Sequence, residues 1–327
     1  MNRFRAPKPC LLILMVAAAS AAGRASDGAL VPLPALPQGD HGIASHYPND
    51  QGIDVDPAVI FHDDFESGDL RNWDNWFQKA DIRFAEEPAN VHSGRRSLEF
   101  TVPQQEAELS NGVVRDFKEG QDVVFLRYYS KFDRGFDQIG SSHNGAILEA
   151  RSPGLPDATP GIRADGKNKF IASLENWRGE AATQSPGRQN VYVYDPEQRS
   201  RYGDHFFPSG TVLPNSEQPN DFGPDFVPRP DFTPELDRWY CFELMVKANT
   251  PGRRDGRIAF WVDGKLTGDF PNLRLRDVDS LKINRAVLSL HIRNNTIRVN
   301  KKWYDDVVAA TSYVGPMADK RFSTTHP

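Results

Sequence analysis

Cysteine is almost missing from this sequence. Only two of the 327 residues are cysteine, and the first, Cys10, falls within an N-terminal stretch that is expected to be removed. The remaining Cys241 leaves a mature chain without an internal disulfide, so its stability has to come from a hydrophobic core. Cys241 lies in the apolar pattern WYCFELMV and is expected to be a buried small side chain rather than a nucleophile.

Long hydrophobic runs are also scarce. The one apolar run covers residues 11–19, between basic residues and a stretch of small ones, which predicts a signal peptide over residues 1–22. This run is too short to span a bilayer, and no later segment approaches a membrane span. We therefore expect a secreted or periplasmic protein without a membrane partner, and a monomer.

Positive charge is in deficit. The chain has 39 Lys and Arg against 44 Asp and Glu, and removing Arg3, Arg5 and Lys8 with the signal leaves 36 against 44, a formal net charge of −8. An acidic chain of this kind argues against nucleic acid and against an anionic membrane as partners. A polyanionic substrate fits only if basic residues gather locally.

Helical periodicity is nearly absent, whereas short segments that alternate apolar and polar residues recur along the chain. Residues 23–58 are rich in Pro and Gly without periodicity, which predicts a linker or an arm lying on the domain. Residues 59–317 predict a single all-β sandwich or jelly roll, followed by a tail over 318–327. Asp263-Gly264, between two strand-like runs, predicts a type I′ hairpin.

The strand VVFLRYYSKF, residues 123–132, has one apolar face and one face that carries Arg127, Tyr129 and Lys131. The second face suits a groove that holds an anionic, ring-shaped ligand, because a cation is costly to bury unpaired. An ordinary solvent-facing strand is the alternative.

Several segments resemble known proteins. FHDDFESGDLRNW, VHSGRRSLEF and WYDDVVAATSYVGP are similar to the opening and closing strands of concanavalin A-like jelly rolls. FLRYYSKFDRGFDQIGSSHNGAIL, RWYCFELMVKANTPGRRDGRIAFWVDGK and WYDDVVAAT resemble the polysaccharide lyases of family fourteen, which cleave alginate and related polyuronates. The resemblance covers about Phe61 to Pro316. It implies a sandwich of two antiparallel sheets with a concave groove for an anionic polysaccharide.

Lytic cleavage of a uronate polymer needs a group that neutralises the substrate carboxylate, a base for the C5 proton and an acid for the leaving oxygen. By resemblance, Tyr192 and Tyr194 match the family's paired catalytic tyrosines, and Arg178 matches its carboxylate-binding arginine. His143 takes the place of the lysine in the family's Gly-Gly-Lys-Leu-Pro-Gly type loop, as a base or a second carboxylate contact. Sugar stacking by the tyrosines and structural roles for His143 and Arg178 are the alternatives.

A wider set of polar side chains is expected to line the same groove. The predicted substrate-binding residues are Arg127, Tyr129, Lys131, Glu149, Arg151, Asn190, His291 and Arg293. A glycoside hydrolase would need paired carboxylates, and the chain has no Glu-x-Asp-x-x-Glu run. The rival of the lyase is a carbohydrate-binding or structural jelly roll without catalysis.

No cofactor is expected for the chemistry, but carboxylates near the two ends of the domain suggest a structural calcium ion. Asp63 and Glu66 near the first strand, with Asp305 and Asp306 in the last, are expected to lie on neighbouring strands. Together with carbonyls of the turn at residues 92–94 they would offer the hard oxygen ligands that calcium prefers. The alternative is that these acids cap turns and pair with arginine.

Overall fold

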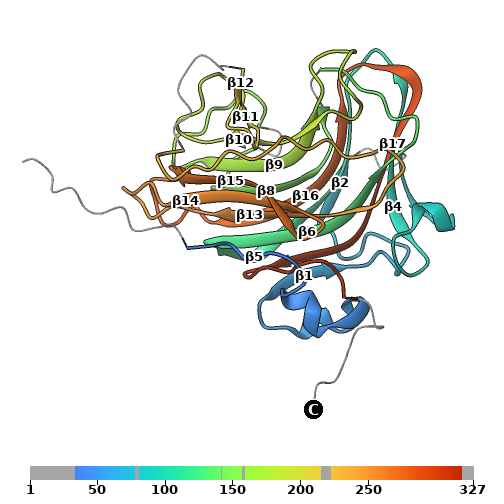
Figure 1. The fold of residues 1–327 in the computed structure, drawn as a ribbon, viewed down its shortest axis with the longest axis horizontal. Helices are drawn as coiled ribbons and strands as arrows, with labels where there is room; N and C mark the ends of the chain where they lie inside the picture. Colours follow the sequence, from blue (N-terminus) through green and yellow to red (C-terminus); the bar gives the residue numbers. More distant parts are fainter. Residues whose placement is uncertain (1–33, 78–80, 141, 157–158, 215–221, 319–327) are drawn as a thin grey trace, which may run out of the picture. The chain divides into compact units, whose positions relative to one another are not determined.

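The structure, a computed structural model, describes residues 34–77, 81–140, 142–156, 159–214 and 222–318 (Figure 1). Contacts group the chain from Ala35 onward into one unit. The predicted signal peptide and nearly all of the predicted tail lie outside the described residues.

Two antiparallel sheets account for the strands of the described residues. Sheet A consists of β1 (Val59–Asp63), β3 (Ile82–Ala85), β4 (Ser97–Gln105), β6 (Val123–Phe132), β13 (Tyr240–Lys247), β14 (Gly256–Val262), β15 (Lys265–Leu273) and β17 (Asn295–Ala310). Its order is β15-β14-β13-β6-β17-β4-β3, and β1 pairs with β17. The first and last strands are thus neighbours, as the sequence predicts.

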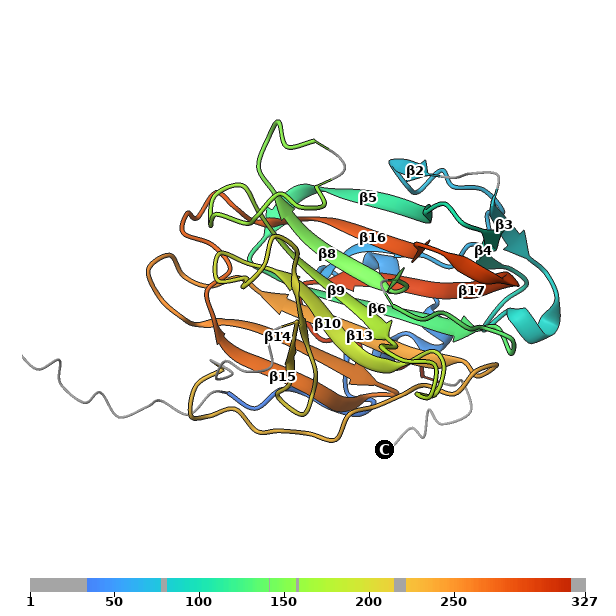
Figure 2. The same cartoon turned by 90° about the horizontal axis from the view of Figure 1, so that it is seen from above.

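Sheet B carries most of the candidate site. It consists of β2 (Asn75–Phe77), β5 (Leu109–Gln121), β7 (Ser142–His143), β8 (Ala146–Arg151), β9 (Lys169–Trp177), β10 (Arg188–Tyr194), β11 (Asp204–Phe206), β12 (Val212–Leu213) and β16 (Ile283–Ile292). Its order is β12-β11-β10-β9-β8-β16-β5-β2, and β7 also pairs with β16. Figure 2 shows the run from β10 through β9, β8, β16 and β5 to β2.

The main hydrophobic core fills the space between the sheets. In β9 the inward residues are Phe170, Ala172 and Leu174, and from sheet A they meet such residues as Leu126 and Tyr128 of β6. Alternation places every second residue of each strand in this layer. The all-β two-sheet prediction is confirmed, and the described residues contain no α-helix.

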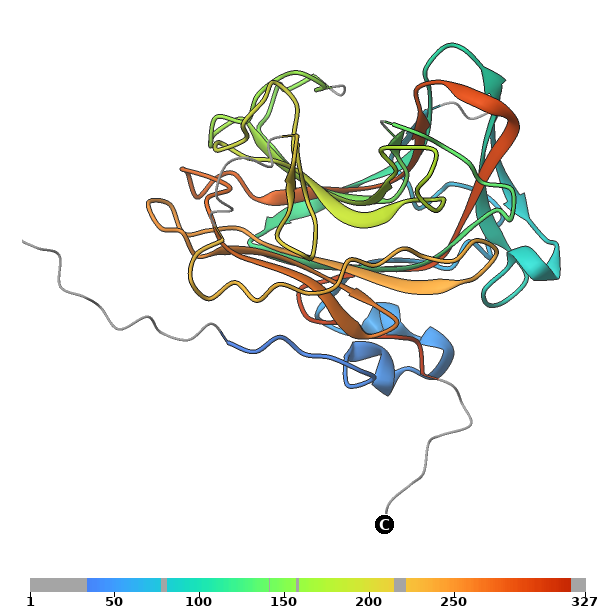
Figure 3. The same cartoon turned by 45° about the horizontal axis from the view of Figure 1, so that its top comes forward.

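Short 3₁₀ helices lie in the N-terminal arm and before β4. They are η1 (Ile43–His46), η2 (Pro48–Asp50), η3 (Ile53–Val55) and η5 (Pro88–Asn90). Figure 3 shows the arm, in blue, beneath the layer that contains the strands of sheet A. The arm packs on the outer face of that sheet, where Ile43 and Ile53 join a second apolar cluster with Trp261 of β14. Trp261 Nε1 donates to the carbonyl of Pro37 at 2.8 Å.

This arm overturns the expected role of the charged face of β6. Arg127 is fully buried, pairs with Asp50 of η2 and donates to the carbonyl of Asp306 at 2.7 Å. Because the arm covers this face and the face belongs to sheet A, Arg127 does not line a groove with the residues of sheet B.

Tyr129 and Lys131, the other two residues of that face, are also buried, but by the loop before β4. The ring of Tyr129 stacks on His92 with centroids 3.5 Å apart. Lys131 donates to the carbonyl of Ala89 at 2.6 Å and to Asn90 at 2.9 Å. Both residues therefore hold the loop before β4 onto sheet A, and their prediction as substrate-binding residues is corrected.

Two further expectations concern local structure. Asp263 and Gly264 connect β14 to β15 with φ values of 48° and 76°, so the type I′ hairpin is confirmed. Cys241 is buried as a free thiol. Across the described ranges, the structure has no helix with the length and apolar character needed to cross a bilayer.

Candidate functional site

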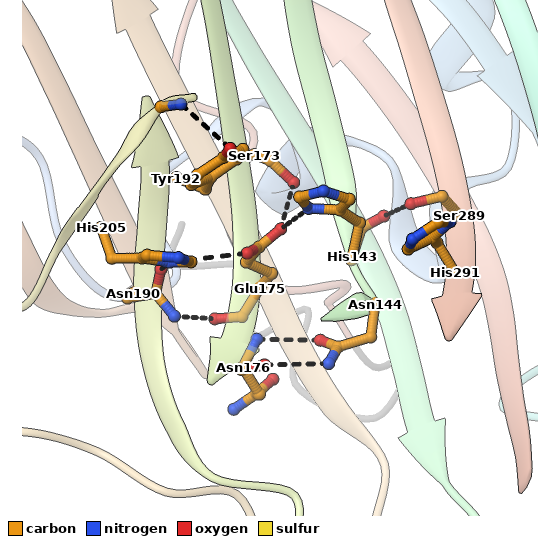
Figure 4. Close-up of polar contacts among 12 residues, drawn as sticks. His143, Asn144, Ser173, Glu175, Asn176, Asn190, Tyr192, His205, Ser289 and His291 are labelled. Carbon is orange, nitrogen blue, oxygen red and sulfur yellow. Dashed lines mark hydrogen bonds and ion pairs between the residues drawn. The ribbon is translucent and has the colours of Figure 1, made fainter. Parts of the chain in front are cut away.

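The candidate site lies on the outer face of sheet B, the face turned away from the core. The inward residues of β10 are Val191 and Val193, which leaves Asn190, Tyr192 and Tyr194 on the outer face. The inward residues of β9 likewise leave Ser173 and Glu175 outward. Figure 4 shows Asn190, Tyr192, Ser173 and Glu175 with their neighbours.

Strand register places the polar side chains in adjacent rows across the sheet. Tyr192 lies opposite Ser173 of β9 on one side and opposite His205 of β11 on the other. Asn190 lies opposite Glu175 in the next row. On the neighbouring strands, His291 of β16 lies opposite both His143 of β7 and Ser110 of β5. Segments far apart in sequence thus meet on one face.

Glu175 stands at the centre of this group. Its Oε2 lies 2.8 Å from His143 Nδ1 and 3.0 Å from the hydroxyl of Ser173 (Figure 4). Its Oε1 is 3.7 Å from His205 Nδ1 and has no hydrogen-bond partner among the described residues. The Glu175 side chain is fully buried, whereas that of His143 is 31% exposed. The imidazole therefore separates the carboxylate from solvent.

Aromatic rings surround this carboxylate. The centroid of His143 is 5.0 Å from that of Tyr192 and 5.3 Å from that of His291. The centroid of Tyr192 is 4.7 Å from that of His205. The Tyr192 hydroxyl accepts a hydrogen bond from the amide of Gly203 at 2.9 Å. Four rings that can carry or exchange protons therefore lie side by side.

The electrostatic environments of the three histidines differ. Burial disfavours the charged form of His143, but the Glu175 carboxylate outweighs it and raises the pKa of His143. Burial and the nearby His143 lower the pKa of His205 to about 4, against the attraction of Glu175. Burial and His143 likewise lower the pKa of His291 to about 4. The site thus holds one imidazole that favours its proton beside two that stay neutral.

Tyr192 keeps its proton for a similar reason. Burial, followed by its contact with Tyr194 and the charge of Glu175, raises the pKa of Tyr192. Its hydroxyl lies 3.4 Å from that of Tyr194. Tyr192 is therefore a phenol that can donate a proton.

Arg178 is brought near the end of β9 but is held by the protein itself. Its guanidinium pairs with Asp137 and donates to the carbonyls of Thr183 at 2.7 Å and Ala181 at 2.6 Å. It has the parity of the inward residues of β9 and is only 9% exposed. These contacts fit a residue that shapes the loop after β9.

The remaining predicted residues of sheet B take different positions. Glu149 and Arg151 lie on the outer face of β8 and pair with each other at 3.0 Å. Tyr194 lies beside Tyr192, and the ammonium of Lys169 is 4.1 Å from its ring centroid. Arg293 is exposed just after the end of β16. Of these, Tyr194 contacts the ring cluster directly.

The four predicted metal ligands do not gather into a calcium site. Asp63 accepts hydrogen bonds from the amide of Phe65 at 3.0 Å and the indole of Trp73 at 2.7 Å. Glu66 accepts from the amides of Arg95 and Arg96 at 2.6 and 2.7 Å. The carboxylates therefore face N–H donors, as the alternative of turn capping predicted.

Asp305 and Asp306 do meet the predicted turn, but through hydrogen bonds. Asp305 accepts from the amide of His92 at 2.9 Å, while Asp306 lies 2.6 Å from His92 Nδ1 and 2.7 Å from the Ser93 hydroxyl. The described part of the chain contains no group of three or more His, Cys, Asp or Glu side chains arranged to hold a metal. The predicted ligand set does not fit a calcium ion.

Three central residues had no assigned role in the sequence. Ser173 and Glu175 follow the alternation of KFIASLEN, which places them on the face of the strand turned away from Phe170 and Leu174. The alternation could therefore have identified both as outward residues. His205 lies in a stretch dense in proline and aromatic residues without a strand pattern, and its pairing with Tyr192 appears only in the folded sheet.

No protein-family profile matches the chain, and no curated protein matches it. Among solved structures, a mutant of alginate lyase Aly36B in complex with alginate trisaccharide is 17% identical, with a TM-score of 0.54, covering 79% of this chain and 99% of that one.

Two further lyases superpose similarly. The PL-14 alginate lyase of Aplysia kurodai is 14% identical, with a TM-score of 0.51 over 78% of this chain and 97% of its own. The endo-β-1,4-glucuronan lyase of the fungus Trichoderma reesei is 16% identical, with a TM-score of 0.50 over 78% and 96%. Identities this low establish the fold alone. The chain therefore has the jelly-roll fold of the alginate and glucuronan lyases, and the resemblance seen in its sequence is confirmed at the level of fold.

Proposed function

We propose that the protein is a polysaccharide lyase that cleaves a uronate-containing polymer by β-elimination. The observation that carries this proposal is the meeting of His143, Tyr192, His205 and His291 around the buried carboxylate of Glu175. Acid–base chemistry needs groups of different proton affinity within reach of one sugar ring, and this cluster offers them. The similarity in fold to alginate and glucuronan lyases supports the same substrate class.

In this proposal His143 neutralises the substrate carboxylate. Its Nδ1 faces Glu175, so its Nε2 is the nitrogen left to donate to the substrate. The carboxylate of Glu175 favours the imidazolium and orients the ring. Neutralising a uronate carboxylate makes its C5 proton more acidic, which is the first requirement of the elimination.

His205 and Tyr192 then move the protons. His205 Nδ1 lies 2.9 Å from Asn190 Oδ1, and a proton on Nδ1 leaves Nε2 of the neutral ring free to take the C5 proton. The electron pair of the C5–H bond forms the C4–C5 double bond, and the bond from C4 to the glycosidic oxygen breaks. Tyr192 gives its proton to that oxygen. The proton on His205 then returns to the neighbouring Tyr192, which restores both groups.

The proposed cellular location is compatible with a polysaccharide substrate. Residues 1–22, outside the described part of the chain, carry the pattern of a signal peptide, and we propose a secreted or periplasmic location. An anionic polysaccharide is then the proposed partner.

The test is incubation of the purified protein with alginate, glucuronan and glycosaminoglycans, followed at the ultraviolet band of unsaturated uronates. We expect the band to rise with at least one polymer, and mass spectrometry to find products without the added water of hydrolysis. A neutral glucan is the control. Retention of a uronate polymer without any rise in absorbance would instead support a carbohydrate-binding module.

A further inference from the structure

Asn144, the residue after His143, joins two strands of sheet B where ladder pairing is interrupted. Its Oδ1 accepts from the amide of Asn176 at 2.8 Å, and its Nδ2 donates to the carbonyl of Asn176 at 2.9 Å (Figure 4). A side-chain amide thus takes both backbone groups of one residue of β9, as a neighbouring strand would. Because β8 and β9 are antiparallel and Ala146 pairs with Leu174, Asn144 lies opposite Asn176, and the outward side chains of His143 and Glu175 lie diagonally, one on each side of this clamp.

The adjacent glycine lets the backbone approach closely enough for this clamp. A Cβ on Gly145 would come 1.7 Å from the carbonyl oxygen of Leu174, so any side chain there would force the strands apart. On its other side, the Gly145 carbonyl accepts from the amide of Ser289 at 3.0 Å. The segment between β7 and β8 is therefore held from both neighbouring strands.

Lys302 contacts Asn144 from the core side of sheet B. It belongs to β17 of sheet A, is 2% exposed, and its amino group donates to the carbonyl of Asn144 across the space between the sheets. The amino nitrogen also lies 4.0 Å from the ring centroid of Phe132 and 5.0 Å from that of Tyr304. Burial lowers the pKa of Lys302 well below its ordinary value, so Lys302 is a buried amine whose hydrogen bond goes to the turn that carries His143.

We propose that Asn144 and Lys302 are positioning residues that hold the imidazole of His143 against the carboxylate of Glu175. The proposal rests on the proposed function only for its effect on turnover, because the His143–Glu175 geometry can be measured without substrate. A lysine amino group inside an apolar core opposes folding, either by the cost of burying its charge or by the cost of giving up its proton. We therefore attribute the presence of Lys302 beneath the site to its role in placing the turn that carries His143, and not to a gain in stability.

The first test uses the substrate-free protein. In Asn144→Ala, both bonds to Asn176 are lost without a change of charge, and histidine side-chain NMR follows the titration of His143. We expect its pKa to fall below the wild-type value, because a displaced Glu175 no longer offsets burial. The ionisable or charged groups that face His143 are Glu175 of β9, Tyr192 of β10, His205 of β11, His291 of β16 and Glu108 before β5.

An unchanged His143 titration in folded Asn144→Ala protein would overturn the proposal for Asn144, whether or not the protein is a lyase. If Asn144→Ala does not fold, the same histidine titration is measured on Lys302→Met, and an unchanged pKa of His143 there would overturn the proposal. Met keeps the volume of the buried stem but removes the donor to Asn144.

The second test compares Lys302→Met with Lys301→Met. Lys301 is the preceding residue of β17, and its ammonium pairs with Glu99 at 2.9 Å on the other face of the strand. On a uronate polymer that the wild type cleaves, we expect Lys302→Met to lower kcat about 10- to 100-fold, because small displacements of a catalytic group are costly. Its melting temperature should hold or rise. Lys301→Met should keep kcat.

Equal kcat in the two variants would refute the role of Lys302. So would a loss of kcat in Lys302→Met that only parallels a loss of folded protein.

Discussion

The carboxylate of Glu175 and the imidazole of His143 form a pair 2.8 Å apart, in which the acid is buried and the base is partly open to solvent. The same carboxylate lies 3.7 Å from His205. One buried charge therefore acts on two imidazoles, raising the pKa of one while only partly opposing the effect of burial on the other. This asymmetry divides the proposed roles between His143 and His205.

Replacing Glu175 with Gln removes the charge and keeps the shape. We expect the pKa of His143 to fall, because burial then acts unopposed, and kcat/KM at neutral pH to fall about 100-fold as the imidazolium is lost. The rate should recover in part toward acid pH, where His143 is again protonated. Histidine NMR and pH–rate profiles check both effects. A variant with the wild-type profile would show that Glu175 does not control His143.

Tyr192→Phe tests the proton donor. Loss of the hydroxyl should reduce kcat about 100- to 10,000-fold while leaving binding of the polymer nearly unchanged. Tyr194→Phe is the matched variant, because Tyr194 meets the cluster through a hydroxyl contact with Tyr192 at 3.4 Å. We expect a smaller loss there. A larger loss in Tyr194→Phe would reassign the acid to Tyr194, the other tyrosine that the resemblance implies. Affinity electrophoresis in the polymer measures binding separately.

Asp195, directly after β10, makes stability depend on pH. Burial raises its pKa from 3.8 to about 7, so the folded protein binds this proton more tightly than the unfolded chain does. The stabilising contribution is complete below the unfolded pKa and is lost as the pH rises through about 7. Asp195→Asn keeps an oxygen for the amide of Glu197 and should flatten the decline. Melting temperatures across this range, with exposed Asp225→Asn as control, provide the measurement.

Asp50→Asn tests the structural role assigned to Arg127. It leaves the fully buried guanidinium without its counter-charge, which is expected to cost about 3–5 kcal/mol in the free energy of unfolding. Asn tolerates the positive φ of this position, 54°, so the backbone should be unaffected. Denaturant unfolding gives the number, and exposed Asp54→Asn in the same arm is the control. Arg127 would return as a candidate ligand contact if stability held while polymer binding fell.

The sequence was sufficient for the all-β class and, in residues 123–132, for which residues share a face, but it did not predict β5 or β11. Alternation in residues 123–132 separated core positions from outward ones correctly, and the same pattern is present in residues 169–176, where no faces were assigned. Positive φ at Asp263 and Gly264 followed from their residue types. These features are local, so a single sequence contains them.

What covers an outward face is not local, and there the prediction was wrong. Arg127 and Glu175 both occupy outward positions of alternating strands, yet one lies under the arm and the other under His143. The difference depends on partners that are 77 and 32 residues away in the chain. Periodicity carries no signal for such pairings, and a pattern-free stretch hid His205 for the same reason.

The packing of the arm also determines where the protein can be shortened or tagged. A truncated chain beginning at Val59 would strip Asp50 from Arg127 and expose Trp261, Met245 and Phe125 to water as one apolar surface. Such a surface invites self-association during expression. An affinity tag therefore belongs before Ala35, where the arm can still dock.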